Sequence, residues 1–337
     1  MAPRVELVAS GRREPDQVSS SAPASVPVPV VVELSLAELL VLSEQSGGAR
    51  LPLDLASFLE PDSDDGEDLL EQRLDGATPS PRQRARTQLR AAVDEARERP
   101  EPSTARLVEA GLLDHAGTPT RGVVSALSLL AAPEALLVLD LAVTRGRGED
   151  RLRSWFAVAG SHVAQLSTAS GLVVELSWYD VGGLPAALAR AATVDEGPGA
   201  KDHGAGVGSP LRLPFELFSD GTEAVRRGRP DILAELVRLA PPATWVAGEE
   251  VAPERVGALV ANLEEAVSGR LRVLVTTPEA EGDAGRRKAG VVSWLRLGGG
   301  WRSLVPLVRE GVPLVEITAV TPRDLARSVG PVLAQVL

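Results

Sequence analysis

The sequence predicts an α+β fold in which an antiparallel sheet carries flanking helices and is built from two pseudo-symmetric halves. Three observations support this: a strand-rich segment at 270–337, a second segment that repeats its landmarks, and an alternating apolar stretch upstream. The first segment contains four apolar, β-branched runs of strand length. These runs are Leu271–Thr276, Val291–Leu297, Trp301–Val308 and Val312–Val320. Turn residues at Gly298–Gly300 and at Glu310-Gly311 predict an antiparallel meander for the last three.

A helix is expected to close this segment. Thr321 can cap it, Pro322 suits its first position, and Asp324 stands where a capping box needs an acid. Apolar residues then recur at helical spacing at Leu325, Val329, Val332 and Val336. Pro331 lacks an amide hydrogen, so we expect the helix to kink there or to end early.

The same landmarks occur in an earlier segment, which indicates an internal duplication. They are, in order, Ser154-Trp155, Gly160 and Glu175 in the first copy and Ser293-Trp294, Gly299 and Glu316 in the second. Two unrelated meanders could also look alike, but the kept order and near-constant spacing favour duplication. The period is far longer than a solenoid repeat, so we expect two halves of one body.

Composition restricts the function. The 337 residues carry a formal net charge of −11, which argues against a nucleic-acid partner. There is no cysteine, which excludes disulfides and thiolate metal sites. No apolar core of a signal peptide is found near the N-terminus, and no apolar run approaches the roughly 18 residues of a membrane span. We expect a cytoplasmic protein without membrane insertion.

The first part of the chain divides into a tail and one half of the fold. Serine, proline and charge at 1–26 predict a disordered tail, and 27–195 forms the N-terminal half. Val30–Leu34 is a strand, and Ser35 caps a helix that buries Leu36, Leu39 and Leu40. Further helices are expected at Pro81–Arg97, Thr104–Leu113 and Thr120–Leu130, the last with Val123, Val124, Leu127 and Leu130 inward. Glu60–Gly66 is an acidic loop without EF-hand spacing.

The first β block follows at residues 133–176. Leu137, Leu139, Leu141 and Val143 alternate with other residues, which predicts one buried face. The charged loop Arg145–Asp150 joins the first two strands, and a helix near Pro185–Ala192 closes the half. A glycine-rich linker at 196–210 then leads to the C-terminal half at 211–337.

Two helices come before the second β block, at Pro230–Ala240 and Pro253–Val267. The second helix is expected to end at Gly269 as a C-terminal cap. Thr277–Ala289 takes the position that Arg145–Asp150 has in the first half.

No motif for catalysis, cofactor or metal is found. His115, His162 and His203 lack metal-ligand spacing, and the glycines of 204–208 follow no strand and precede no helix. Trp155 and Trp294 fit core positions better than a stacking pair. Asp140, Glu175 and Glu316 are strand carboxylates with no evident acid–base partner. We therefore expect no catalytic residue, cofactor or metal, and a binding protein is favoured over an enzyme.

Three stretches resemble the EspG-type proteins of type VII (ESX) secretion. The first joins Glu33–Leu40 (ELSLAELL), Leu51–Leu55 (LPLDL) and Leu107–Leu113 (LVEAGLL). The second is Leu129–Ala135 with Val158–Gly160, and the third is Gly290–Leu337. The resemblance covers most of 31–337. It implies an antiparallel sheet with quasi-two-fold symmetry, flanked by helical bundles, in a cytosolic chaperone that binds PE–PPE heterodimers.

The resemblance also implies where a partner binds. The contact surface would correspond to Arg145, Arg147, Glu149 and Asp150, and to the helices of Pro230–Val267. Most of the affinity would come from apolar side chains on those helices, such as Leu236 and Leu259, if they face outward. Two departures are Gly298–Trp301, where the family has an Arg-Gly-Arg-like turn, and an acidic insertion at 60–75.

Three hypotheses follow. The first is a secretion chaperone for a helical client of PE–PPE type, which predicts an exposed apolar patch beside a charged loop and no deep polar cleft. The second is a hydrolase or transferase with a site between the halves, which predicts a pocket of converging ionisable residues. The third is a module that associates with a second copy of itself as a homodimer.

Overall fold

The computed structural model describes residues 30–52, 98–146, 148–168, 173–194, 210–241, 243–277, 289–298 and 300–337, with isolated positions between 87 and 95. Several predicted segments lie outside these residues. They are the tail at 1–26, the acidic loop Glu60–Gly66, most of Pro81–Arg97, nearly all of the linker at 196–210 and most of Thr277–Ala289. Those predictions, and the division of the chain at 196–210, stay predictions.

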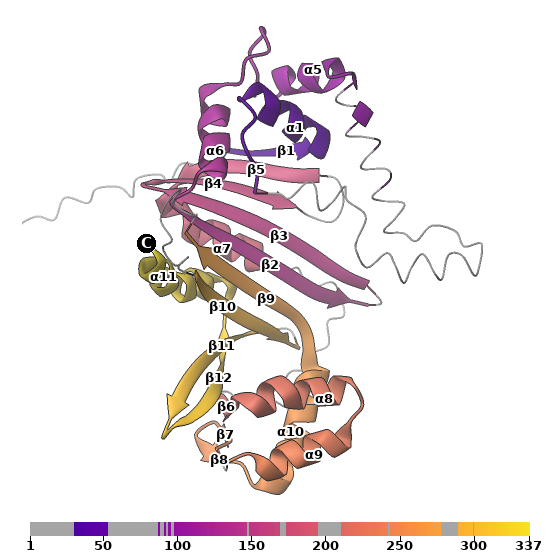
Figure 1. The fold of residues 1–337 in the computed structure, drawn as a ribbon, viewed down its shortest axis with the longest axis vertical. Coiled ribbons are helices and arrows are strands. Elements are labelled where there is room, and N and C mark those ends of the chain that lie inside the picture. The colour runs from indigo at the N-terminus through magenta and orange to yellow at the C-terminus, as the bar shows by residue number, and fades with distance from the viewer. Residues whose placement is uncertain are drawn as a thin grey trace, which may run out of the picture.

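Within the described residues, the strands form one continuous antiparallel sheet in the order β1-β5-β4-β3-β2-β9-β10-β11-β12-β6-β7-β8 (Figure 1). The first half supplies β1 (Val30–Ser35), β2 (Ala135–Arg145), β3 (Gly148–Ala159), β4 (His162–Thr168) and β5 (Val173–Asp180). The second half supplies β6 (Leu211–Pro214), β7 (Trp245–Val246), β8 (Glu249–Glu250), β9 (Val267–Thr276), β10 (Ala289–Leu297), β11 (Gly300–Arg309) and β12 (Val312–Val320). The predicted meander of the last three long strands is confirmed.

The two halves repeat each other around the central β2–β9 pair. Read outward from that pair, one side runs β2, β3, β4, β5, β1 and the other runs β9, β10, β11, β12, β6. The strands β5 and β12 each lead through a 3-10 turn into a helix. After β5 the turn Val181–Gly183 precedes α7 (Leu184–Ala192), and after β12 the turn Pro322–Asp324 precedes α11 (Leu325–Val336). The predicted pseudo-symmetric α+β fold is confirmed.

The residue correspondence differs by one from the sequence landmarks. The turns that follow β3 and β10 place Gly160 at φ 53° and Gly298 at φ 58°, so Gly298 is the counterpart of Gly160. With that alignment Phe156 corresponds to Trp294, and both are buried in one core cluster. Trp155 is buried on the opposite face. The two tryptophan strands are equivalent as predicted, but the tryptophan-to-tryptophan match is wrong, because successive strand residues point to opposite faces.

One face of the sheet, here called the α7–α11 face, is covered by those two helices. Its core combines residues from both halves, including Leu137 and Phe156 from the first and Val273 and Trp294 from the second. The alternation predicted for β2 is confirmed, since Leu137, Leu139, Leu141 and Val143 all belong to this cluster.

The other face, here called the lobed face, carries helices at its two ends (Figure 1). At the first end α1 (Leu36–Gln45), α5 (Glu101–Glu109) and α6 (Arg121–Ala131) pack over a core that includes Trp155 and Leu166. At the second end α8 (Thr222–Arg226), α9 (Pro230–Leu239) and α10 (Pro253–Ala266) pack over Leu295 and Ile317. A π-helical turn at Leu217–Gly221 leads into α8.

Local signals set the first-half helices. Ser35 and Glu38 form a full capping box at the start of α1, as the Ser35 cap predicted. Helix α5 begins and ends earlier than predicted, and the chain turns at Gly111 with φ 69°. In α6, Val124 is 39% exposed, so its predicted inward position is wrong. It follows Val123 by one residue, and one residue rotates about 100° around a helix.

One prediction about a helix end is wrong, and for a second helix the structure removes one of two predicted alternatives. Helix α10 ends at Ala266 and the chain passes directly into β9, so Gly269 is a strand residue and not a cap. A Cβ at Gly269 would lie 2.9 Å from the carbonyl oxygen of Ala142, so the close β2–β9 contact requires glycine there. Helix α11 begins after Thr321 and Asp324 as predicted, but it continues past Pro331 to Val336 and does not end early. None of the described helices is long and apolar enough to cross a membrane.

Candidate partner-binding surface

The charged segment predicted as a loop is mostly strand. β2 ends at Arg145 and β3 begins at Gly148, so two residues separate the strands, the first of which is Gly146. Gly146 has φ 59°, a conformation that glycine adopts without strain. Arg147 lies outside the described residues. Glu149 and Asp150 are therefore held by the sheet, and the prediction of a loop over Arg145–Asp150 is wrong because the strands pair up to the turn.

The hairpin charges divide between the two faces of the sheet. Arg145 Nε lies 3.1 Å from Asp150 Oδ2, beside a cavity of about 310 Å³ that Thr193 and Val194 also line. Glu149 instead pairs with Arg151, with Nη2 2.6 Å from Oε2. Both ion pairs are largely exposed, so they contribute little to stability. Their side chains remain accessible to a partner.

The helical part of the predicted site is more buried than expected. Leu236 on α9 and Leu259 on α10 are half-buried and pack against the core beneath the helices. The large apolar side chains that α9 exposes are Ile232 and Leu239, at 40% and 63%. Leu236 and Leu259 therefore hold the bundle together, and the outer apolar surface of α9 is made by their neighbours.

The structure brings the β2–β3 hairpin and the helical bundle together at the point where β2 ends and β9 begins. Val143 of β2 is the register partner of Gly269 of β9, and β9 begins where α10 ends. The β2–β3 turn therefore lies next to the α10–β9 junction. Sequence reasoning chose these two regions separately, and the sheet register places them side by side.

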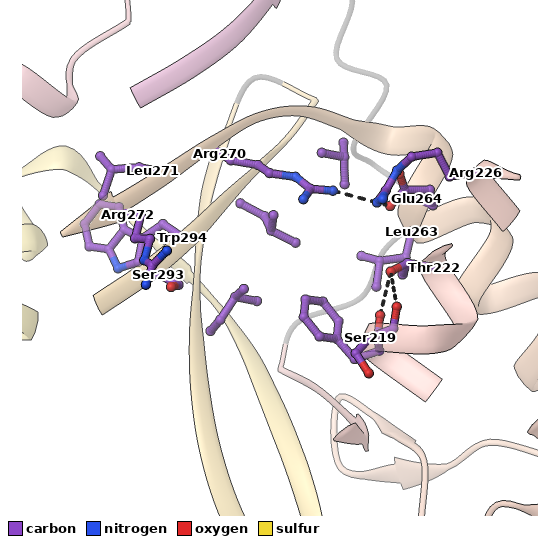
Figure 2. A pocket seen from close by; sticks show the side chains of 14 residues that line it. Ser219, Thr222, Arg226, Leu263, Glu264, Arg270, Leu271, Arg272, Ser293 and Trp294 are labelled. Carbon is purple, nitrogen blue, oxygen red and sulfur yellow. Dashed lines mark hydrogen bonds and ion pairs between the residues drawn. The ribbon is translucent and has the colours of Figure 1, made fainter. Parts of the chain in front are cut away.

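A cleft of about 340 Å³ opens at this junction, between the central strands and the helical bundle (Figure 2). Phe218, Leu263, Leu295 and Leu304 supply apolar lining. Polar and charged lining comes from Ser219, Thr222, Arg226, Glu264, Arg270, Arg272 and Ser293. The Thr222 hydroxyl contacts the backbone carbonyl of Phe218 at 2.6 Å, so it is satisfied within its own helix. The cleft combines an apolar wall with a charged rim.

The charged rim is centred on Glu264, whose side chain is only 14% exposed. Arg226 Nε donates to Glu264 Oε1 at 2.9 Å, and Arg270 Nη2 lies 3.9 Å from Oε2 (Figure 2). The hydrogen bond with Glu264 raises the pKa of Arg226 above its ordinary value. This partly buried carboxylate therefore fixes one arginine and leaves the second loosely held.

Four arginines lie on the lobed face of the central strands, and sequence reasoning did not select them. They are Arg151 and Arg153 on β3 and Arg270 and Arg272 on β9, here called the arginine patch. Each pair sits in an Arg-Leu-Arg triplet, and the leucines, Leu152 and Leu271, point to the opposite face. The repeated Arg-Leu-Arg triplet could have indicated the patch from the sequence, because alternate residues of a strand lie on the same face of the sheet.

The histidines and strand carboxylates considered as catalytic candidates from the sequence do not come together in the described residues. His162 Nδ1 lies 3.5 Å from Asp180 on the surface, and His115 is exposed, whereas His203 lies outside the described residues. Asp140 and Glu316 each pair with an arginine, Arg153 and Arg212 respectively. No group of three potential metal ligands was found among the described residues.

A buried polar chain on the α7–α11 side is fully paired. The Tyr179 hydroxyl donates to Gln165 at 2.9 Å, and the Gln165 amide donates to the Ser167 hydroxyl at 2.9 Å. Burial raises the pKa of Tyr179 far above its ordinary value, and Arg190 opposes that shift. Tyr179 is therefore a neutral hydrogen-bond donor, which suits a structural role.

Comparison with solved structures identifies the fold of this chain. No protein-family model matches the sequence, and no curated protein matches it. The structure is similar to EspG5 of Mycobacterium tuberculosis, a type VII secretion system chaperone solved in complex with the PE25–PPE41 dimer. The TM-score is 0.52 at 14% identity, and the match covers 91% of this chain and 97% of that chain. The chain has the EspG5 fold.

The EspG5 fold confirms, at the level of architecture, the resemblance inferred from the three sequence stretches. It accounts for the antiparallel sheet, its two halves and the helices at both ends, because the match spans almost the whole chain. Two dehydratase structures, of CurJ and of the difficidin assembly line, are similar only at TM-scores of 0.12 and 0.10, with 10% identity each. They cover 60% and 59% of this chain and 82% of each dehydratase chain, and such scores carry no argument.

Proposed function

We propose that this protein is a cytoplasmic secretion chaperone that binds a helical client of PE–PPE type and keeps it soluble before export by a type VII system. The observation that carries the proposal is the EspG5 fold over 91% of the chain, since EspG5 was solved with a PE25–PPE41 dimer. The described surface supports the proposal, because a charged hairpin, an apolar-walled cleft and a helical bundle lie together where β2 ends and β9 begins.

The proposed client site uses both predicted regions. Arg145, Arg147, Glu149 and Asp150 would set the encounter rate and the choice of partner, as charges at an interface rim do. The apolar contact would come from the cleft and from exposed side chains of α9, namely Ile232 and Leu239. Leu236 and Leu259 would act indirectly, by holding α9 and α10 against the core.

The direct test is capture of the client. The tagged chain would be expressed in an actinobacterium that has a type VII system, and the proteins that co-purify would be identified by mass spectrometry. We expect a stoichiometric complex with a helical protein pair of PE–PPE type, and we expect the pair to lose solubility when it is expressed without the chain. Recovery of only the chain itself, as a dimer, would contradict the proposal.

A matched pair of variants tests the hairpin. Arg145→Glu with Arg147→Glu should weaken binding of the captured client by about 1–3 kcal/mol, because both changes place repulsive charge at the rim. Thermal stability should not change, since the Arg145–Asp150 ion pair is half exposed. Arg121→Glu with Arg323→Glu makes the same charge change at two exposed positions away from the hairpin and should leave binding intact. Full binding by the hairpin variant would exclude the hairpin from the site.

A further inference from the structure

The centre of the lobed face has two neighbouring rows of side chains that the register defines. One row runs Arg153, Asp140, Arg272 and Ser293 across β3, β2, β9 and β10. The next row runs Arg151, Ala142, Arg270 and Leu295 across the same strands. Directly opposed residues of antiparallel strands share a face, so the arginine patch forms one surface.

The carboxylates near the patch do not neutralise it. Asp140 pairs with Arg153, Glu149 with Arg151, and Glu264 is shared between Arg226 and Arg270. Arg272 is exposed and has no ion pair among the described residues. Arg226 also pairs with Glu223, which Arg227 shares, so six arginines lie against four carboxylates in a chain whose overall net charge is −11. A local excess of positive charge in an acidic protein is the opposite of what composition alone would produce.

An apolar surface borders the patch on two sides. The row on the far side of Arg153 contains Val138, Leu274 and Val291, of which Val291 is 46% exposed. The cleft described above opens beside Arg270 and Arg272, with Phe218 and Leu263 in its wall (Figure 2). A ligand that covered the patch would therefore meet arginines at its centre and apolar side chains at its margins.

We propose that the arginine patch is the docking site for an acidic, amphipathic helical segment of a partner protein, with carboxylates over Arg270 and Arg272 and an apolar side chain in the adjoining cleft. The proposal rests on the proposed function for the helical nature of the partner, and it adds the partner's charge. Arginine suits this role because its planar group can donate two parallel hydrogen bonds to one carboxylate. A nucleic acid is the less favoured occupant, since the chain as a whole would repel it.

The test uses three labelled alanine-based helical peptides of equal length, which carry Glu, Gln or Lys at the same positions. Binding to the full chain is measured by fluorescence anisotropy at low and high salt. We expect the Glu peptide to bind at least ten-fold more tightly than the Gln peptide, with affinity that falls as salt rises. The Lys peptide should not bind. Equal binding of the three peptides would overturn the proposal.

Variants assign the binding to the patch. The double variant Arg270→Glu with Arg272→Glu should abolish binding of the Glu peptide. The double variant Arg270→Gln with Arg272→Gln should weaken binding by a smaller factor. If one of the two variants fails to fold, the other still tests the patch. Arg121→Glu with Arg323→Glu is the control and should bind normally. If the patch variants bind as the wild type does, or if a uridine oligonucleotide displaces the peptide and itself depends on the patch, the proposal is wrong.

The two proposals fail separately. Patch-dependent binding of the Glu peptide, without any secreted helical client in the capture experiment, would refute the chaperone proposal and support the docking site. Capture of a PE–PPE-type client that binds the patch variants normally would support the chaperone and refute the docking site.

Discussion

At the residue scale, two neighbouring tryptophans show what a buried hydrogen bond contributes. Trp294 and Trp301 are both buried, and their ring centroids lie 6.3 Å apart. The Trp301 indole donates to the backbone carbonyl of Ala192 at 2.9 Å, which ties β11 to the end of α7. The Trp294 indole nitrogen is buried without a hydrogen-bond partner among the described residues. A buried donor without a partner costs free energy.

This difference predicts unequal effects of the same substitution. Trp→Phe removes similar volume at both positions, so the cavity terms should be alike. Trp301→Phe also leaves the Ala192 carbonyl without its donor, whereas Trp294→Phe removes an unpaired donor. We expect Trp301→Phe to be more destabilising than Trp294→Phe by about 1–2 kcal/mol in urea unfolding. Equal costs would mean that the Trp294 indole is satisfied in solution.

At the element scale, the start of the last helix depends on one carboxylate. Asp324 accepts from the Thr321 amide at 2.9 Å and from the Thr321 hydroxyl at 2.7 Å, and Arg327 lies 3.0 Å away. The Thr321 backbone hydrogen bond is the main reason that the pKa of Asp324 is lowered from 3.8. The ionised carboxylate is therefore the form that holds the helix start.

The sign of the pH dependence follows. Because the folded-state pKa lies below the unfolded one, the stabilisation is complete above the unfolded value and is lost as the pH falls through the folded value. We expect Asp324→Asn to unfold at a lower temperature than the wild type at pH 7, and the gap to narrow below about pH 4. A gap that stays constant down to pH 3 would show that Asp324 acts without its charge.

Sequence patterns identified most elements because the signals are local. Ser35 with Glu38 and Thr321 with Asp324 mark helix starts, and the alternation from Leu137 to Val143 marks a buried strand. Features that depend on strand pairing were missed. The hairpin at Arg145 is short because its strands pair up to the turn, and Gly269 is a strand residue because β9 lies against β2. The arginine patch is formed by register between strands distant in sequence, which no local pattern contains.

At the scale of the whole molecule, the two halves share one sheet and one core. Eight register pairs join β2 to β9, and the cluster on the α7–α11 face draws residues from both halves. Neither half could keep that core buried alone, so we expect the chain to unfold as one cooperative unit.

The tryptophans make this testable. Trp155 and Trp178 report on the first half, and Trp245, Trp294 and Trp301 report on the second. In two variants that keep tryptophan in only one half, with phenylalanine in the other, the fluorescence and circular dichroism midpoints should coincide in urea. Fluorescence that changes at a lower urea concentration than circular dichroism in either variant would show that the halves unfold separately.

The same arrangement places the proposed client site between the two lobes, on strands that neither half builds alone. The floor of the site comes from β2 and β3 of the first half and from β9 and β10 of the second. Its wall comes from α8 and α10 at one end. A client held there would contact both halves, which agrees with a chaperone whose binding surface exists only in the complete fold.

The central claim is that this face holds a helical secretion client, and site-specific photo-cross-linking in the native cell tests it most directly. A photoreactive amino acid would replace Val291, which is 46% exposed beside the arginine patch, or, as the control, Val31, which is 45% exposed on the edge strand β1. We predict that position 291 cross-links to a helical secreted protein of PE–PPE type and that position 31 does not. A secreted protein captured only from position 31, or no secreted protein captured from position 291, would contradict the account.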